Sequence, residues 1–388
     1  MAELAAPFGG QQVAVLGAGT MGQGVAQVAL EAGHAVALYD PDAAALERAE
    51  GALRERLKRL EAKGRLAASA ASVLARLRPV RALEDLAGCA WVIEAAPERL
   101  ALKLELFGRV GAVLPEAVLA TNTSTLSVTR IAQGAPRPER VLGLHFFNPA
   151  PLMRLVEVVP GLATASEVLE EARFFVQGLG KTAIVARDAP GFIVNRVARA
   201  FYLEALRLHG EGLPVATIDR AMRGLGFKMG PFELMDLIGL DINYASSLSV
   251  FEQTFFEPRF RPHPLQARMV EAGLLGRKSG RGFYPYPQER PDDEVGTRSL
   301  SSLRPYLIGP EDLLEAFAEW PQTEDPAEAD FVLDLFGEPQ GLSLDEWHAE
   351  TLLDSDLPVV RLAWSGSASL LAGDVGPSEI AGFSLVPP

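Results

Sequence analysis

A histidine in an apolar stretch is a first residue whose type could support acid–base chemistry. His145 stands in LHFFNP, at residues 144–149, directly after the run VLGL, and the chain has only 5 histidines in 388 residues. An imidazole titrates near neutral pH, so it can accept and return a proton during a reaction. A core histidine whose ring nitrogens bond to the backbone would look the same in the sequence. His145 by itself leaves both alternatives open.

A glycine loop near the N-terminus predicts a binding site for the phosphates of a dinucleotide. GAGTMG places Gly17, Gly19 and Gly22 in the spacing G-x-G-x-x-G, after an apolar run and before a helical stretch. The first glycine permits a tight turn, the second lets the backbone approach a pyrophosphate, and the third allows close packing of helix and strand. The first helical residues, Thr20 and Met21, then present backbone N–H groups to the phosphates. The alternative is a structural turn that binds nothing.

An acidic residue at the end of the next apolar run indicates which dinucleotide is bound. Asp40 ends AVALYD and is placed to accept hydrogen bonds from ribose hydroxyls. Pro41 and Asp42 follow it, so no neighbouring arginine is available for a 2′-phosphate. The sequence therefore favours NAD over NADP.

The bulk composition argues against several other classes of protein. The formal net charge is −14, which disfavours nucleic acid or an anionic membrane as the main partner. No apolar stretch approaches the roughly 18 residues of a membrane span, and no signal peptide is recognisable, so we expect a cytoplasmic protein. Cys89 is the single cysteine, and no cluster of His, Asp and Glu has the spacing of metal ligands. We therefore expect no disulfide within the chain and no metal.

Over residues 1–186, apolar strand-like runs alternate with helical stretches. Such alternation is typical of an α/β fold of the Rossmann type, with a parallel, doubly wound sheet that positions the glycine loop and His145. The expected strands are at 13–19, 35–40, 91–96, 117–124, 141–147, 155–159 and 182–186, and one charged helix is expected from Pro41 to about Lys63.

The composition changes after residue 186. A mostly helical domain is expected over 187–286, beginning with a long helix that has Pro190 near its start. Residues 287–329 are rich in Pro, Asp, Glu and Ser, which indicates a linker. Residues 330–388 then suggest a small α/β module of unknown role, with strand character in FVLDLFG, LPVVRLAWS and EIAGFSLV.

Several motifs together give the chain a family resemblance. VLGAGTMGQGVAQ, VIEAAPERLALK, LATNTSTLSV, LHFFNPAPLMRLVEVV and DAPGFIVNRV follow one another in the order found in the L-3-hydroxyacyl-CoA dehydrogenase family. The resemblance covers about residues 10–286. It implies a Rossmann-type NAD-binding domain followed by a helical domain that mediates dimerisation and substrate binding, and we expect the homodimer contact within residues 215–250.

The resemblance also implies which residues react. His145 matches the catalytic base of the family, Glu157 the acid that orients it, and Ser124 and Asn195 the residues that line the reacting oxygen. This set suits oxidation of a secondary alcohol, because a neutral imidazole takes the hydroxyl proton while a carboxylate stabilises the imidazolium. The two phenylalanines of HFFNP are expected to form a dry wall around this base. Taken singly, Glu157 could be an exposed acid at a strand edge, Ser124 a helix N-cap, and Asn195 a polar residue on a long helix.

Further positions are implied for cofactor and substrate. Asn122, Glu98 and Lys103 match positions at the cofactor and its neighbouring loops, and Asn148 lies in the substrate motif. Coenzyme A phosphates would meet basic residues of the long early helix, including Arg54 and Lys58. That helix also carries interleaved glutamates, so a solvated charged face is an equal alternative.

The function implied is NAD-dependent oxidation of (S)-3-hydroxyacyl-CoA to 3-oxoacyl-CoA and the reverse, for short chains such as 3-hydroxybutyryl-CoA, as in fatty acid β-oxidation. Two alternatives stay open: a dehydrogenase of a hydroxy acid without coenzyme A, such as gulonate, and a non-catalytic NAD-binding protein. Residues 287–388 exceed the minimal family unit, and the sequence leaves their role open.

Overall fold

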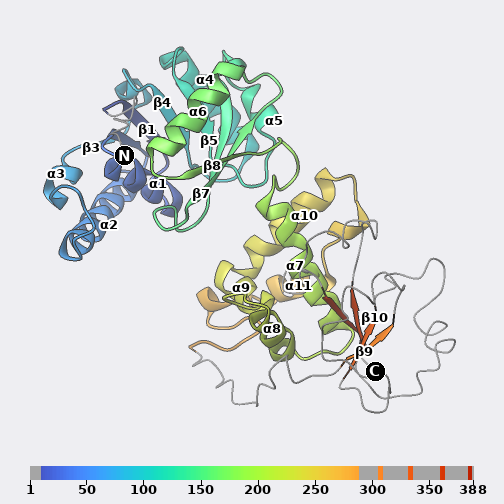
Figure 1. The fold of residues 1–388 in the computed structure, drawn as a ribbon. Coiled ribbons are helices and arrows are strands. Elements are labelled where there is room, and N and C mark those ends of the chain that lie inside the picture. The colour runs from blue at the N-terminus through green and yellow to red at the C-terminus, as the bar shows by residue number, and fades with distance from the viewer. Residues whose placement is uncertain (1–9, 288–304, 309–330, 335–358, 363–382, 387–388) are drawn as a thin grey trace. The chain divides into compact units, whose positions relative to one another are not determined.

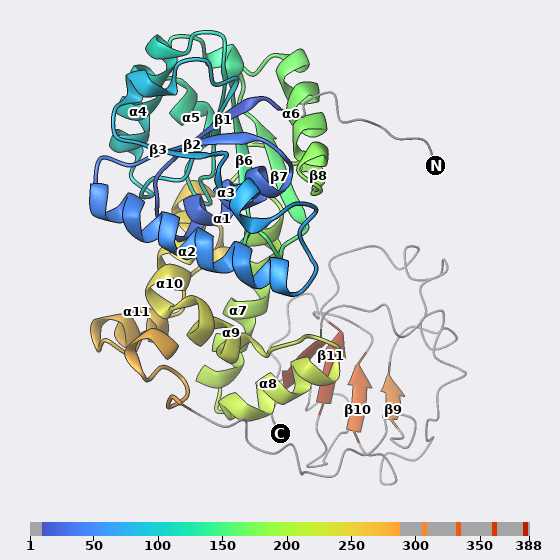
Figure 2. The ribbon, with the colours of Figure 1, turned by 90° about the vertical axis from the view of Figure 1, so that its left-hand side faces the viewer.

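The described part of the chain forms two compact units. The computed structural model describes residues 10–287 and four later strands at 305–308, 331–334, 359–362 and 383–386. The first unit contains the described residues of 1–200 together with 245–262. The second contains 201–244 and the described residues from 263 onward. Figures 1 and 2 show both units as ribbons.

An eight-stranded sheet is the centre of the first unit (Figure 1). Its strand order is β3-β2-β1-β4-β5-β6-β7-β8, which is the doubly wound arrangement predicted from the alternating runs. The strands are β1 (Gln12–Leu16), β2 (Ala35–Tyr39), β3 (Leu77–Val80), β4 (Trp91–Glu94), β5 (Val118–Thr121), β6 (Val141–Phe146), β7 (Leu155–Pro160) and β8 (Thr182–Val185).

Helices cover both faces of this sheet, and each face has its own apolar core. One core joins the sheet to α1, α2, α3 and α6, and the other joins it to η1, α4 and α5. The inner strands can be apolar on both faces because the helices shield both faces from water, whereas the edge strands β3 and β8 are partly exposed. The bounds are α1 (Thr20–Glu31), α2 (Ala43–Ala62), α3 (Ala70–Leu74), η1 (Leu83–Leu86), α4 (Leu100–Val113), α5 (Val128–Ala132), η2 (Pro138–Arg140) and α6 (Ser166–Gly178).

The expectation of an all-parallel sheet was wrong at one pair of strands. β6 and β7 run antiparallel, whereas the other neighbouring pairs of this sheet are parallel. The connection between them, residues 147–154, is shorter than the dozen or so residues that a parallel crossover needs, so the chain turns back on itself.

One strand of the sheet was missed in the sequence. β3 is Leu-Arg-Pro-Val, and only its last residue is buried. It lies at the edge of the sheet, where Pro79 can be accommodated although it has no N–H to donate. Arg78 and Pro79 interrupt the apolar run by which a strand is recognised in the sequence.

The predicted helices after residue 186 are present, with different bounds. They are α7 (Val194–Gly210), α8 (Val215–Gly224), α9 (Pro231–Ile238), α10 (Leu240–Gln253), η3 (Pro258–Phe260), α11 (Pro264–Glu271) and η4 (Arg277–Ser279). α7 begins later than Pro190 because Gly191 and Phe192 have φ values of 74° and 48°, outside the helical region. α9 and α10 are separate because Gly239 has a φ of 100°.

Two buried aspartates hold the second unit together. Asp219 accepts hydrogen bonds from the amides of Phe232 and Glu233 at the start of α9, and from the hydroxyl of Tyr284. Asp236 accepts from the amides of Phe283 and Tyr284. Burial raises the pKa of both carboxyl groups, although these hydrogen bonds oppose the shift. Each carboxylate thus joins segments that are distant in the sequence.

Exposed apolar side chains lie within the segment expected to form a dimer contact. Leu225, Phe227, Leu237 and Ile242 are between 46% and 56% exposed on the single chain. The homodimer itself stays a prediction.

A second sheet belongs to the second unit. Its strands are β9 (Pro305–Ile308), β10 (Phe331–Asp334), β11 (Val359–Leu362) and β12 (Phe383–Val386), in the order β12-β11-β10-β9. β9, β10 and β11 are parallel, and β12 is antiparallel to β11. The last three strands coincide with the runs that predicted the module at 330–388, and β9 falls within the predicted linker at 287–329. The rest of both ranges lies outside the described residues.

No helix within residues 10–287 is long and apolar enough to cross a bilayer, and the later described segments are four short strands.

Two glycines of the nucleotide loop give a matched test of the fold. A Cβ at Gly22 would lie 1.7 Å from the carbonyl oxygen of Gly17, whereas a Cβ at Gly19 would meet nothing within 4 Å. Gly22→Ala should therefore lower the free energy of unfolding by about 1–3 kcal/mol through overpacking. Gly19→Ala should change it by less than about 1 kcal/mol. Denaturant unfolding of both variants checks this, and equal losses would contradict it.

Candidate active site

The pairing of β6 with β7 brings His145 and Glu157 together. The two residues are register partners in the antiparallel pair, so their side chains project from the same face. Nδ1 of His145 lies 2.5 Å from Oε2 of Glu157, and the residues are 3% and 0% exposed. The expected pairing of these two residues is therefore present in the geometry. An exposed acid at a strand edge, the alternative for Glu157, is excluded by its burial.

The second ring nitrogen of His145 faces Ser124. Nε2 lies 3.1 Å from Oγ of Ser124, in the loop between β5 and α5. Because Nδ1 faces a carboxylate, we assign the ring proton to Nδ1, which leaves Nε2 to accept the serine hydroxyl proton. The N-cap of α5 is Ser127, so the helix-cap alternative for Ser124 is wrong.

Asn195, in the first turn of α7, lies beside this pair. Its side-chain amide donates to the carbonyl oxygen of Ser124 over 3.4 Å, which is long for a hydrogen bond. The four residues implied by the family resemblance thus lie in one place and come from four different elements. Their catalytic roles stay a proposal.

Glu157 also binds the backbone at the start of α7. Its Oε1 accepts from the amides of Ile193 and Val194, at 2.9 and 3.0 Å. Burial disfavours the charged carboxylate, but the bond to His145 and these two amides outweigh burial and hold the pKa of Glu157 below its usual value. The site therefore contains an ionised acid beside the imidazole.

The apolar wall around His145 differs from the expected one. The sequence predicted that both phenylalanines of HFFNP face the base, but Phe146 points into a core of the sheet. Successive residues of a strand point to opposite faces, so Phe147 lies on the side of His145, with 4.5 Å between the ring centroids. The second ring is Phe192, at 5.6 Å, from the turn before α7. Phe192 is distant from His145 in the sequence, so no local motif indicated this contact.

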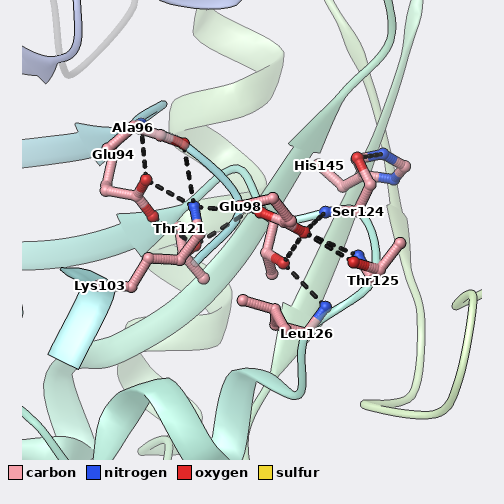
Figure 3. A network of polar contacts seen from close by, with 10 residues as sticks. Glu94, Ala96, Glu98, Lys103, Thr121, Ser124, Thr125, Leu126 and His145 are labelled. Atoms are coloured by element: carbon pink, nitrogen blue, oxygen red, sulfur yellow. Dashed lines mark hydrogen bonds and ion pairs between the residues drawn. The ribbon is translucent and has the colours of Figure 1, made fainter. Parts of the chain in front are cut away.

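A chain of charges, buried at Glu94 and Lys103 and partly exposed at Glu98, supports the loop that carries Ser124 (Figure 3). Oε1 of Glu98 accepts from the amides of Ser124 and Thr125, at 2.9 and 3.0 Å, and from the hydroxyls of Thr123 and Thr125. Its Oε2 lies 3.2 Å from Nζ of Lys103. Partial removal from water opposes ionisation of Glu98, but Lys103 and these donors outweigh it and lower the pKa of the carboxyl.

Lys103 also pairs with a second acid, Glu94, which was not predicted as a site residue. Nζ of Lys103 lies 2.6 Å from Oε1 of Glu94, and both side chains are at most 1% exposed. Oε2 of Glu94 accepts from the hydroxyl of Thr121. An acid at the end of the apolar run WVIE was the available signal, because a buried charge requires a partner.

The geometry of the glycine loop fits a dinucleotide. Gly17 has a φ of 105°, and a Cβ on it would lie 2.7 Å from the carbonyl oxygen of Ala95, so only glycine suits this turn. Gly19 is the N-cap of α1 and makes no side-chain cap, which leaves the first N–H groups of α1, from Thr20 and Met21, open to a phosphate. The open space at Gly19 is where a pyrophosphate could approach the backbone.

Asp40 accepts hydrogen bonds from two backbone amides, one of which belongs to the glycine loop. Its Oδ2 accepts from the amide of Ala18 at 2.9 Å, and its Oδ1 accepts from the amide of Asp42 at 3.0 Å. A carboxylate has further lone pairs that can accept ribose hydroxyls.

The remaining predicted residues are more dispersed. The side-chain oxygen of Asn122 accepts from the amide of Phe146, so it joins β5 to β6. Asn148 is exposed after β6. Arg54 and Lys58 lie on α2 and pair with Glu50 and Glu55 at 2.6 and 3.5 Å. Contact of Asn148, Arg54 or Lys58 with substrate stays a prediction, and so does a cofactor contact of Asn122.

A small cavity adjoins the loop of Ser124. Its volume is about 230 Å³, and it is lined by Thr125, Leu126, Ser127, Asp188, Ala189, Pro190, Gly191, Phe192 and Gln253. These residues all belong to the first unit. Among the described residues, no group of three or more His, Cys, Asp or Glu side chains could hold a metal ion.

Comparisons with known proteins agree with this geometry. Residues 12–189 match the family described as 3-hydroxyacyl-CoA dehydrogenase, NAD binding domain. Residues 191–286 match the family described as 3-hydroxyacyl-CoA dehydrogenase, C-terminal domain.

Individual relatives carry related names. The 3-hydroxyadipyl-CoA dehydrogenase of Escherichia coli K12 is 48% identical over 295 residues, which are 75% of this chain but only 62% of that protein. A probable 3-hydroxybutyryl-CoA dehydrogenase of Deinococcus radiodurans is 41% identical over 276 residues, covering 70% of this chain and 99% of that protein. A crystal structure of 3-hydroxybutyryl-CoA dehydrogenase from Escherichia coli K12 matches with a TM-score of 0.76 and 42% identity, covering 92% of this chain and 73% of that one.

The two matched families cover most of the described chain, and they coincide with the glycine loop and the histidine–glutamate pair. The chain therefore belongs to the 3-hydroxyacyl-CoA dehydrogenase family, and NAD is the cofactor of its N-terminal domain.

Proposed function

We propose that the protein oxidises the 3-hydroxyl group of an (S)-3-hydroxyacyl-CoA to the 3-oxo group, and catalyses the reverse reduction. The observation that carries this proposal is the position of His145, between Glu157 and Ser124. A base held by an ionised acid on one side, with a hydroxyl donor on the other, suits proton transfer to and from a substrate oxygen.

His145 is the general base of the proposed reaction. Nε2 takes the proton of the substrate hydroxyl, while the Nδ1–H stays bonded to Glu157. The carboxylate stabilises the imidazolium that forms, and it holds the ring in the required tautomer. Bound NAD supplies the acceptor for the hydride that leaves the same carbon. In the reverse direction, the imidazolium returns the proton to the oxygen.

Ser124 and Asn195 orient the substrate oxygen. The hydroxyl of Ser124 already lies within hydrogen-bond distance of Nε2, so a substrate oxygen in this position would contact both groups. A donor aimed at the oxygen stabilises the negative charge that develops on it during reduction. Phe147 and Phe192 limit the access of water to the imidazole.

Short acyl chains are the proposed substrates. The relatives named above differ in this respect, since one is named for a 3-hydroxyadipyl and others for a 3-hydroxybutyryl thioester.

Turnover of defined esters tests the proposed reaction. We expect NADH consumption with acetoacetyl-CoA, and a ranking of 3-oxoacyl-CoA esters by kcat/KM, 3-oxoadipyl-CoA included, should favour short chains. Reduction of NAD with gulonate, without activity on any thioester, would favour the hydroxy-acid alternative. If no compound turns over although NADH binds, the non-catalytic alternative holds.

Replacing Glu157 by glutamine tests its role beside His145. The amide keeps the size but loses the charge, and its NH₂ can face Nδ1 and favour the wrong tautomer. We expect kcat to fall by about 10² to 10⁴, which is roughly 3 to 5 kcal/mol. Glu116→Gln, at an acid whose side chain is 80% exposed, is the matched control and should retain activity.

The same variant has consequences for stability and coupling. Glu157 also accepts from two amides at the start of α7, and the neutral oxygen of glutamine accepts from them more weakly than a carboxylate, so Glu157→Gln should lower Tm. The folded-state pKa is depressed, so this stabilisation is present above the unfolded pKa of about 4.3 and is lost as the pH falls below it. The Tm difference should shrink with falling pH. The double variant with His145→Gln should be scarcely worse than the worse single variant; additive losses would contradict the pairing.

Asp40 should determine the choice of cofactor. Asp40→Ser removes acceptors for the ribose hydroxyls and a charge that repels a 2′-phosphate, so NADH binding should weaken and NADPH should become usable. Asp40→Asn is a matched variant that can still accept from Ala18 but has no charge. Fluorescence titration with NADH and NADPH measures both affinities. An unchanged preference in both variants would mean that Asp40 does not face the ribose.

A further inference from the structure

Lys181 makes an unusual set of contacts that the proposed mechanism does not use. It lies just before β8, and its Nζ donates to the backbone carbonyl oxygens of Ala150, Pro151 and Met153, at 2.7, 3.1 and 2.9 Å. A lysine ammonium has three N–H donors, so all three are directed at one short segment. Burial lowers the pKa of this amine, and the charge of Glu31 opposes the shift only in part.

The segment that Lys181 binds is the connection between β6 and β7. Residues 147–154 link these two strands, and the strands carry His145 and Glu157 as register partners. In a two-strand hairpin, the conformation of the connection sets the register. A shift by one residue would turn Glu157 to the opposite face of the sheet. The shape of residues 147–154 therefore contributes, together with the pairing of β6 to β5 and of β7 to β8, to the alignment of the acid with the base.

The side chains of this connection do little to anchor it. Leu152 and Met153 are 73% and 41% exposed, so burial of apolar surface does not hold this half of the loop. Ala150 is buried, with its Cβ 3.1 Å from where a Cβ of Gly24 would lie. The loop thus rests against α1, the helix whose N-terminus faces the phosphate position.

We propose that Lys181 is a positioning residue that clamps residues 150–153 and thereby sets the geometry of His145 and Glu157. Its ammonium holds the loop by binding three backbone carbonyls at once, since the exposed side chains of Leu152 and Met153 do not. The next residue extends the contact, because the amide of Thr182 donates to the carbonyl of Arg154. The effect on turnover rests on the proposed function, whereas the clamp itself does not.

The clamp can be measured without any substrate. The amides of Leu152 and Met153 both donate to the carbonyl of Pro149, so their hydrogen exchange reports on the loop. In Lys181→Met, which keeps the length and removes the charge, we expect these two amides to exchange at least about tenfold faster. Amides of β1 should keep their wild-type rates, which separates local loosening from global unfolding. Arg173→Met, at a surface ion pair on neighbouring α6, is the matched control and should change neither.

The position of the catalytic pair has its own signal. The proton between Nδ1 of His145 and Oε2 of Glu157 should give a downfield NMR resonance, assigned by its absence in His145→Gln. We expect this resonance to shift or broaden in Lys181→Met. The kcat should fall by about 10- to 100-fold with a smaller change in KM for the thioester, because misplacing a catalytic group affects the reaction more than binding.

Chemical rescue separates the charge from the side-chain volume. Lys181→Ala lacks three methylenes and the ammonium, so n-propylammonium should slow the exchange of Leu152 and Met153 again and restore the NMR resonance. n-Propanol, of the same shape without the charge, should restore neither. Lys181→Arg keeps a positive charge and should retain more protection than Lys181→Met.

Three results would overturn the proposal. Unchanged exchange of Leu152 and Met153 in Lys181→Met would mean that there is no clamp. Faster exchange with an unchanged His145–Glu157 resonance would mean that the clamp does not position the pair. Equal rescue by n-propanol would mean that the charge is not responsible. If the wild-type protein turned over no 3-oxoacyl-CoA, the proposed function would fail, while the exchange and NMR results would still decide on the clamp.

Discussion

His145 and Glu157 meet because β6 and β7 run antiparallel in the register that pairs them. Side chains alternate between the faces of a strand, so both residues face the same side only in registers that keep this parity. The carboxylate also binds two amides at the start of α7, which joins the hairpin to the helix that carries Asn195. Glu157 therefore positions the imidazole of His145, the start of α7 and, through this helix, the side-chain amide of Asn195.

A second set of charges, buried except for Glu98, supports the opposite side of the site. Glu94 and Glu98 share the ammonium of Lys103, and Glu98 uses its other oxygen to bind the loop of residues 123–125. Buried ions are tolerated only where partners compensate the loss of water, so Glu94 and Lys103 need each other. The result is a rigid support for Ser124, the residue that faces Nε2 of His145.

The order of the strands explains why the cofactor loop and the acid–base pair are neighbours. β1, β4, β5 and β6 are parallel and adjacent, so the loops that follow them lie along one edge of the sheet. The glycine loop follows β1, Glu98 follows β4, Ser124 follows β5, and His145 lies near the end of β6. In open α/β sheets this edge is where ligands bind. The topology thus brings the glycine loop and the pair of His145 and Glu157 to one edge of the sheet.

Much of this could be predicted from local patterns in the sequence. The alternation of apolar runs and helices, the glycine spacing and Asp40 depend on residues close together in the chain, and family motifs added His145, Glu157, Ser124 and Asn195. β3 was missed because an edge strand needs no apolar pattern, and the start of α7 was misplaced because the backbone at Gly191 and Phe192 leaves the helical region.

Other features were decided only by the tertiary structure. The antiparallel direction of β7, the replacement of Phe146 by Phe192 beside the imidazole, the partner of Glu94 and the three carbonyls at Lys181 each depend on segments that are distant in the sequence. The sequence determined which local elements form and which residues are able to react, since propensity and periodicity act over a few residues. Which side chains contact one another was decided by packing, because a buried charge or ring needs a partner, and that partner can come from a segment that is distant in the sequence.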